Sequence, residues 1–349
     1  MKNKILFITT QYRVGERVYP ILPHLSKIYD LDILKLYQMD SSHKWVGDND
    51  PRVLFDEKYI GEFKNVYSVS NISSIDFGKY NLILADDNRG RNHLPEIYSY
   101  KKCPMVGCSH GNTNKNYLDE YHKIAFDKCF VFGNSKKERN VNAIPAGIPA
   151  NDALKNYVNE EPEHILIIVN FLGNRNSPFE INFNEELFKH LKLHIIQKKF
   201  DKKILIKLKS RADEKGYKHN VDYLKSILPG DLDYEIAIDV EDDNLMVAKS
   251  CCVISAPSTM TLKPIQLGIP TVIIEGTGQS GVLQHFHGYI NTDWLYNTEK
   301  LSIDMINLLN KQIEDKLLNK KFIEKTLYGG NDFNSTQIFL NEIGNIING

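Results

Sequence analysis

Short apolar runs, each ending in a polar or glycine-containing turn, recur along the whole chain. They are separated by segments with helical spacing, and continuous apolar strands of this kind are typical of parallel sheets that are covered on both faces. The pattern predicts strands at residues 4–10, 31–36, 80–85, 104–108, 126–132, 164–171, 204–208, 234–238, 252–255 and 271–274. The fold class that follows is α/β.

The alternation restarts near residue 150. Residues 141–152, VNAIPAGIPAND, are punctuated by Pro and Gly and are the best candidate for a linker. We therefore expect two Rossmann-like, doubly wound lobes, residues 1–150 and 151–349, with a ligand cleft between them. The 349 residues suit two domains.

Helical spacing is clearest in a few segments. Residues 16–28 fit a helix despite Pro20 and Pro23, and residues 242–249 fit another. Residues 184–200 also fit a helix, although the far end fits a strand equally well. The C-terminal region shows two helical patterns around a break at residues 329–334, and residues 38–60 are polar and irregular.

The most informative stretch is SAPSTMTLKPIQLGIPTVIIEGTGQSG, residues 255–281. A strand, a Pro-Ser-Thr turn, a helix ending at Gly268 and a second strand make a parallel crossover unit. The turn places the hydroxyls of Ser258 and Thr259 beside free backbone amides at the start of a helix, which suits a phosphate group. Ordinary helix capping is the competing interpretation, and the two are compatible.

The net charge, the cysteines and the length of the apolar runs exclude several classes of protein. A net charge of −1 argues against a dominant nucleic-acid surface. The five cysteines form no C-x-x-C pair, so neither a zinc site nor a disulfide framework is indicated, and a reducing cytoplasm is expected. The apolar core at residues 5–8 is too short for a signal peptide, and no run approaches the roughly 18 apolar residues of a membrane span.

Four stretches, in order, resemble the GT-B glycosyltransferases, and most closely the CDP-glycerol glycerophosphotransferase and Kdo-transferase group. They are residues 106–113 with His110-Gly111-Asn112-Thr113, residues 144–154, residues 204–211 ending in Lys209-Ser210-Arg211, and residues 242–274. The resemblance implies a GT-B fold and a nucleotide-activated donor. Lys209 and Arg211 are candidates to neutralise the charge of the leaving group in place of a metal, so that no cofactor is required; a solvated strand end is a strong competing interpretation.

Two departures from the family pattern limit this resemblance. Lys263 stands near the place where an acidic residue commonly follows the Ser-Thr pair, and Lys209 stands where the basic motif has histidine. CDP-glycerol is therefore not carried over as the substrate. Lys263 is a further donor-binding candidate on the same helix as the pair.

Acid–base candidates lie after the strands of the first half. His110 suits the base that deprotonates an acceptor hydroxyl, because the pKa of histidine lies near neutrality; a turn histidine bonded to the backbone is the alternative. Asp86 is a second base candidate and Asp87 an acceptor anchor, although a solvated loop explains that doublet as well. Glu16 is a further catalytic candidate.

Two other loops are assigned to ligands. Arg13 and Gly15 follow the first strand, where an acceptor-side loop is expected. Gly276 and Gly278 belong to a G-x-G-x-x-G run, but residues 282–288 are too short for a crossover helix followed by a strand, so we interpret the run as a donor-side loop. His285 and His287 lack further ligands at a useful spacing, and no metal site is predicted.

The predicted function is a metal-independent transferase. Its donor is a nucleotide-sugar or a CDP-polyol, and its acceptor is a hydroxyl on a glycan, on a polymer or, less favoured, on a nucleic-acid base. Two alternatives remain: a UDP-sugar 2-epimerase, which needs no acceptor, and a non-catalytic GT-B-like nucleotide-binding protein. The lysine-rich residues 198–218 allow peripheral contact with the inner face of the membrane, a solvated strand edge being the default.

Overall fold

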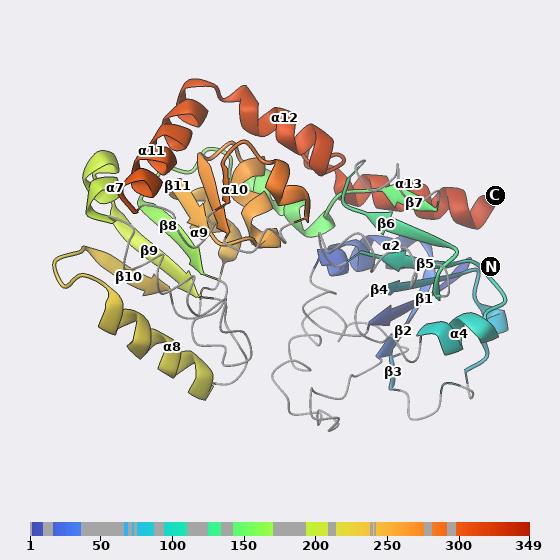
Figure 1. Ribbon diagram of the computed structural model, residues 1–349. Helices are drawn as coiled ribbons and strands as arrows, with labels where there is room; N and C mark the ends of the chain where they lie inside the picture. Colours follow the sequence, from blue (N-terminus) through green and yellow to red (C-terminus); the bar gives the residue numbers. More distant parts are fainter. Residues whose placement is uncertain are drawn as a thin grey trace. The chain divides into compact units, whose positions relative to one another are not determined.

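The computed structural model describes residues 2–9, 17–35, 66–68, 72, 75–86, 94–109, 125–133, 142–169, 193–208, 214–237, 240, 242–275, 281–291 and 298–349 (Figure 1). Its contacts divide the chain into two compact units. The first unit comprises Met1–Asp152 and Glu324–Gly349, and the second comprises Ala153–Ile323. Each unit is described by itself.

The first unit is built on a seven-stranded parallel sheet in the order β3-β2-β1-β4-β5-β6-β7. Its strands are β1 (Lys4–Thr9), β2 (Asp30–Lys35), β3 (Val66–Ser68), β4 (Leu82–Asp86), β5 (Met105–Cys108), β6 (Lys128–Val131) and β7 (Ala143–Pro145). Alternate residues of β1 enter two separate cores, Ile5 and Phe7 on one face and Leu6 and Ile8 on the other. The continuous apolar run is thus explained by burial on both faces.

Helices cover both faces of this sheet. On one face lie η1 (Tyr19–Ile21), α2 (Leu22–Ile28) and the C-terminal helix α13 (Ser335–Asn348), and on the other lies α4 (Leu94–Tyr100). Figure 1 shows α13, in red, beside β6 and β7. Phe339 of α13 packs on Phe130 of β6 with ring centroids 4.3 Å apart.

The second unit holds a six-stranded parallel sheet in the order β10-β9-β8-β11-β12-β13. Its strands are β8 (His164–Val169), β9 (Lys203–Leu208), β10 (Tyr234–Ala237), β11 (Ser250–Ser255), β12 (Thr271–Glu275) and β13 (Tyr289–Asn291). Counted within the unit this is the order 3-2-1-4-5-6 of doubly wound nucleotide-binding sheets. The predicted fold class, two Rossmann-like α/β lobes, is confirmed.

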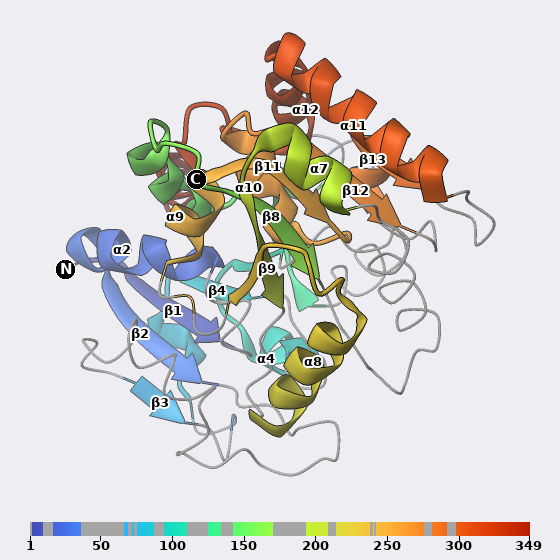
Figure 2. The same ribbon diagram turned by 90° about the vertical axis from the view of Figure 1, so that its left-hand side faces the viewer.

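Two groups of helices sandwich the second sheet. One face is covered by α7 (Leu193–Phe200), α8 (Glu214–Ile227) and α11 (Thr298–Glu314), and the other by α9 (Asp243–Ala248) and α10 (Leu262–Gln266). Figure 2 shows α11 running beside β12, and the two elements are in contact. Helix α12 (Leu317–Thr326) follows α11.

The end of the chain differs from the predicted domain assignment. Residues 151–349 were expected to form one lobe, but residues 324–349 pack in the first unit. The reason is the apolar face of α13, whose Phe339 and Ile343 are buried in the core that also contains Phe7 and Leu25. The sheet of the first unit would be uncovered there without this helix.

The interpretation of residues 141–152 as a linker is wrong. Its first part is β7, which pairs with β6. Beyond β7, Gly147 has a positive φ of 78°, and the Ile148 amide donates to the Ser335 hydroxyl oxygen at 3.2 Å. The carboxylate of Asp152 accepts from the Ser335 and Thr336 amides at 3.0 and 2.6 Å. The turn at Gly147 thus leads into the segment that binds the start of α13.

Several elements were not predicted. Strand β3 and helices α4 and α8 carry too little apolar periodicity to be recognised in the sequence. Residues after the Gly-x-Gly run do form a crossover, because the short 3₁₀ helix η7 (Gly281–His285) leads into β13. A 3₁₀ helix rises about 2.0 Å per residue against 1.5 Å in an α-helix, so few residues suffice. The last region contains three helices rather than two, with the expected break before α13.

Candidate functional site

The candidate site begins where β11 ends, at the carboxyl edge of the second sheet. Strand β11 is central, between β8 and β12, and its last residue, Ser255, is fully buried. Residues 256–258 turn out of the sheet into η6 (Thr259–Thr261) and α10. In doubly wound sheets this edge, outside the carboxyl ends of the strands, is where ligands bind.

Ser258 is held by local hydrogen bonds. It is extended, with φ −151°, and its hydroxyl accepts from the Met260 amide at 3.2 Å. The Ser258 carbonyl oxygen accepts from both the amide and the hydroxyl of Thr261. Helix capping by Ser258 is therefore realised, and it fixes the direction in which the turn leaves β11. We refer to residues 256–259 as the donor turn.

The carboxylate of Asp242 lies at the start of α9 and joins several groups. One oxygen accepts from the Asn244 and Leu245 amides at 2.8 and 3.1 Å, and the other accepts from the Tyr157 hydroxyl at 2.5 Å. Burial raises the pKa of Asp242, but these hydrogen bonds and the charge of Lys263 outweigh it and hold the pKa below its ordinary value. Asp242 is therefore ionised at neutral pH.

A second ion pair at this edge was not predicted from the sequence. Lys207, on β9, lies 3.1 Å from the carboxylate of Asp243, and its side chain is only 14% exposed. The side-chain oxygen of Asn244 is buried without a hydrogen-bond partner among the described residues. The signal that points to Lys207 is a lysine inside the buried run KILIKL, but Lys209 and Arg211 were preferred because they follow the strand.

Three predicted site residues, Ser258, Thr259 and Lys263, are described in full and lie on one connected segment, the donor turn with η6 and α10. Asp86 is the last residue of β4, in register with Cys108 of β5, and its side chain is not described. The remaining predicted site residues lie outside the described residues: Arg13, Gly15, Glu16, Asp87, His110, Lys209, Arg211, Gly276 and Gly278.

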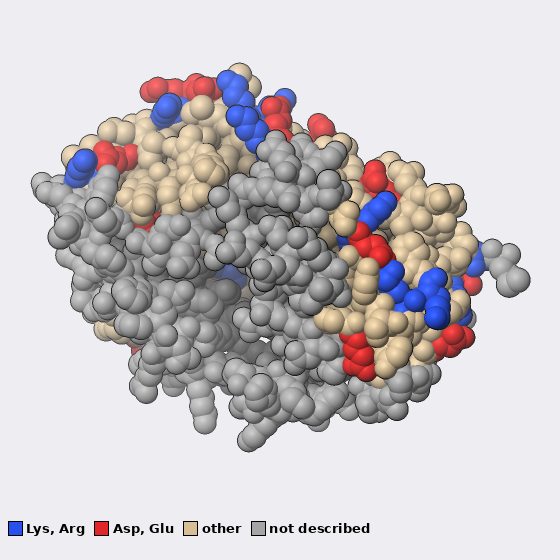
Figure 3. Space-filling view, turned by 45° about the vertical axis from the view of Figure 1, so that its right-hand side comes forward, with Lys and Arg blue, Asp and Glu red and all other residues tan. Residues whose placement is uncertain are grey.

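Some lysines of the segment 198–218 form ion pairs with carboxylates of the same unit. Lys203 lies 2.6 Å from Glu235, in addition to the pair made by Lys207. On the face shown in Figure 3, the described basic and acidic side chains are interspersed and do not gather in one patch. No helix in the described part of the chain is long and apolar enough to cross a membrane. Peripheral membrane contact stays a prediction.

A metal site needs several His, Cys, Asp or Glu side chains close together. Within the ranges that the structure describes, no group of three or more His, Cys, Asp or Glu is arranged to hold a metal ion. Burial lowers the pKa of His287, which favours its neutral form. Independence of the reaction from metals stays a prediction.

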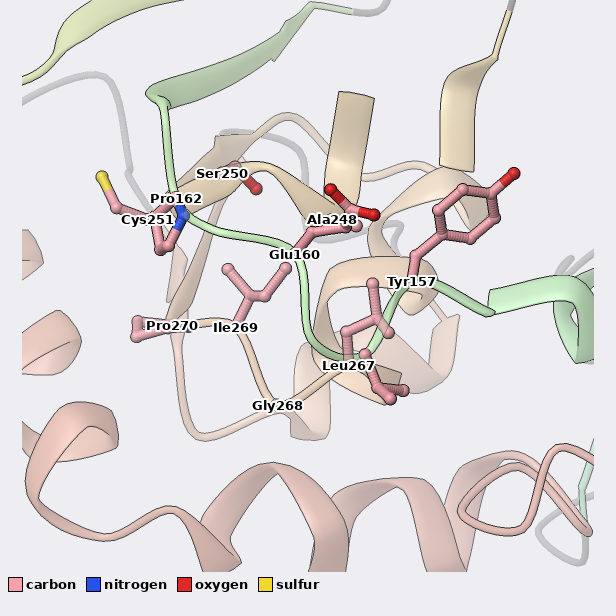
Figure 4. A pocket seen from close by; sticks show the side chains of 11 residues that line it. Tyr157, Glu160, Pro162, Ala248, Ser250, Cys251, Leu267, Gly268, Ile269 and Pro270 are labelled. Atoms are coloured by element: carbon pink, nitrogen blue, oxygen red, sulfur yellow. The ribbon is translucent and has the colours of Figure 1, made fainter. Parts of the chain in front are cut away.

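A small cavity lies at the opposite edge of the second sheet. It has a volume of about 220 Å³ and is bounded by the segment before β8, the start of β11 and the turn before β12. Figure 4 shows the Cys251 sulfur and the Tyr157 hydroxyl pointing away from it. Its remaining lining is mostly apolar, including Leu267, Ile269 and Pro270. We assign no ligand to it.

Cys251 should be the more reactive of the two half-buried cysteines. A hydrogen bond with the neighbouring Cys252 thiol lowers the pKa of Cys251, whereas burial raises the pKa of Cys103 to about 11. Because the thiolate is the nucleophile, iodoacetamide at neutral pH should modify Cys251 first. Peptide mass spectrometry after limited labelling measures the order. Earlier labelling of Cys103 would contradict the prediction.

Comparison with known proteins bears on the fold. No protein-family model matches the sequence, and no curated protein is significantly similar to it. Solved structures do match over the whole length. MnaA from S. aureus, solved with UDP, is 14% identical with a TM-score of 0.63, covering 100% of this chain and 97% of its own. UDP-GlcNAc 2-epimerase from Neisseria meningitidis, bound to UDP-GlcNAc, is 13% identical with a TM-score of 0.60, covering 98% and 100%.

A third match is MurG from Acinetobacter baumannii, which is 10% identical with a TM-score of 0.54 and covers 98% of this chain and 99% of its own. The chain has a GT-B-type fold. Further UDP-GlcNAc 2-epimerases are among the similar structures. The narrower resemblance to the CDP-glycerol glycerophosphotransferase and Kdo-transferase group finds no support in these matches.

Proposed function

We propose that this GT-B-type chain binds a UDP-sugar at the donor turn and acts as a UDP-sugar 2-epimerase. The observation that carries the proposal is the whole-length likeness of both units to structures solved with UDP or UDP-GlcNAc. The epimerase was the alternative in our sequence interpretation, and it now replaces the transferase as the leading function.

The donor turn offers suitable chemistry for a diphosphate. Ser258 and Thr259 follow β11, a central strand whose last four residues are buried, so the backbone that leads into them is held by the sheet. Lys263 follows in α10, and Lys207 is the second-last residue of β9. Both ammonium groups interact with carboxylates, Asp242 and Asp243 respectively, and can share their charge with phosphate oxygens.

Inversion at C2 requires a base that removes the C2 proton while the C1–O bond to UDP breaks, which leaves a C1–C2 double bond. UDP then forms its bond to C1 again as an acid returns a proton to the other face of C2. We assign these roles to residues of the first unit, with His110, Asp86 and Glu16 as the candidates named above. Histidine and carboxylate side chains are the usual proton-transfer groups at neutral pH. No acceptor takes part in such a reaction.

Incubation with UDP-GlcNAc in deuterated water, without any acceptor, tests the proposal. We expect a second UDP-sugar that differs at C2 and carries deuterium there, because the proton lost to the base exchanges with solvent. Proton NMR follows both changes. Unchanged UDP-GlcNAc, together with a normal melting curve for the protein, would contradict the epimerase.

A glycosyltransferase is the second candidate. It is favoured by the MurG likeness. It predicts that UDP is released only when a hydroxyl acceptor such as a glycan or polymer is added. UDP, CDP, CMP and GDP, free and sugar-linked, should be compared by thermal shift, since a ligand at about 100 times its Kd stabilises a protein by about 2.7 kcal/mol. Stabilisation without turnover would favour a non-catalytic binding protein.

A further inference from the structure

The Asp242 carboxylate connects three segments of the second unit that are far apart in sequence. Its hydrogen bonds cap α9, and the Tyr157 hydroxyl reaches it from the end of η5 (Pro149–Tyr157). The charge of Lys263, in α10, contributes to lowering the pKa of Asp242. Helices α9 and α10 also contact each other directly.

The Tyr157 side chain lines the cavity at the opposite edge of the sheet and donates its hydrogen bond to Asp242. Figure 4 shows its ring with the hydroxyl directed away from the cavity of the opposite edge. The bond is short, 2.5 Å between the hydroxyl and carboxylate oxygens, and its acceptor is an ionised group. Hydrogen bonds to ionised groups are about twice as strong as those between neutral groups. The contact therefore fixes where the Asp242 carboxylate is held.

The donor turn lies directly before the helix that carries Lys263. Ser258 caps η6, and η6 continues without a break into α10. A shift of α10 would therefore move the hydroxyls of Ser258 and Thr259 together with the ammonium group. None of these links crosses from one unit to the other, since residues 153–323 form the second unit.

We propose that Tyr157 and Asp242 are positioning residues, which hold Lys263 and the donor turn in the arrangement that binds the diphosphate of the donor. The inference rests on the proposed function, because it takes the donor turn to be the phosphate site. It assigns a role to Lys263 at the place where the family resemblance leads one to expect an acidic residue: its ammonium group is held by a carboxylate at the start of the preceding helix.

Tyr157→Phe is the cleanest test, because it removes one hydroxyl and leaves every charge and the α9 cap in place. We expect UDP to bind about five- to tenfold more weakly, which is less than the full effect of one hydrogen bond to a charged group, because Tyr157 acts on the diphosphate only through Asp242 and Lys263. Tyr98→Phe is the matched control, since the Tyr98 hydroxyl also donates to an aspartate, Asp127, at 2.8 Å, but in the first unit. The dissociation constant of UDP is measured by calorimetry for each variant.

Asp242→Asn separates positioning from simple electrostatics. Asparagine still caps a helix, so α9 should stay folded. If the carboxylate acted only through its charge, removing it would strengthen UDP binding, because a negative charge near the diphosphate would be gone. We expect weaker binding instead, and tighter binding by Asp242→Asn would overturn the proposal.

A double-mutant cycle tests whether Tyr157 changes the affinity for UDP through Lys263. If Tyr157 acts through Lys263, Tyr157→Phe should have little further effect on UDP affinity in a Lys263→Met background. Equal losses in both backgrounds, or wild-type affinity of Tyr157→Phe, would overturn the inference while leaving the UDP site intact. Absence of UDP binding by the wild-type protein would instead refute the proposed function.

Discussion

Gly147→Ala should destabilise the first unit by about 2–5 kcal/mol. The backbone at Gly147 has φ +78°, which costs a residue with a Cβ roughly 1–2 kcal/mol. An added Cβ would also lie 2.2 Å from the Ser335 hydroxyl oxygen and 2.4 Å from the Tyr328 carbonyl oxygen, so the start of α13 would have to move. Overpacking of this kind costs about 1–3 kcal/mol more. Urea unfolding followed by tryptophan fluorescence and circular dichroism measures the loss.

Gly268→Ala is the matched control. Gly268 has nearly the same φ, +75°, but a Cβ there meets no atom within 4 Å. Only the backbone term remains, so we expect a loss of about 1–2 kcal/mol. Equal effects of the two substitutions would show that the docking of α13 on residues 147–152 contributes nothing beyond the dihedral angle.

Ser258→Asp should abolish UDP binding without unfolding the protein. Aspartate caps helices as well as serine does, so stability should stay within about 0.5 kcal/mol of wild type. Its negative charge would stand beside the diphosphate of the donor, and we expect affinity to fall by about 100-fold or more, on the order of two lost interactions with a charged group. Isothermal calorimetry with UDP, beside a melting curve for each variant, separates the two effects.

Ser258→Ala in combination with Thr259→Ala should weaken UDP binding about 10- to 100-fold, and should also lose roughly 1 kcal/mol of stability with the cap. Ser226→Ala is the control, since Ser226 is an exposed serine on α8 whose hydroxyl donates to the Tyr223 carbonyl. If UDP binds Ser258→Asp as it binds wild type, the phosphate site is elsewhere.

The strands that are buried on both faces could be predicted, because such burial leaves an unbroken apolar signature. Residues 4–10 and 271–274 were predicted to within one residue of β1 and β12 at either end. Helix α8 could not be predicted, because its sequence, EKGYKHNVDYLKSI, is largely polar. The role of α13 was equally hidden, since its apolar face shows that it is buried but not in which unit.

The candidate site was predictable only where neighbours in sequence are also neighbours in space. The donor turn could be predicted in this way, because β11, the Ser258-Thr259 pair and α10 follow one another along the chain. The hydrogen bond between Tyr157 and Asp242 joins residues 85 positions apart, and no local pattern marks it. The ion pair of Lys207 with Asp243 likewise depends on the packing of α9 against β9.

The return of the last helix to the first unit has a consequence for biosynthesis. A ribosome releases the strands of the first sheet early, but the helix that packs on Phe130 is made only after the whole second unit. The second unit, continuous from Ala153 to Ile323, can complete its core while one face of the first sheet still lacks part of its cover. The order of folding is therefore expected to invert the order of synthesis, and the nascent first unit is where chaperones should bind.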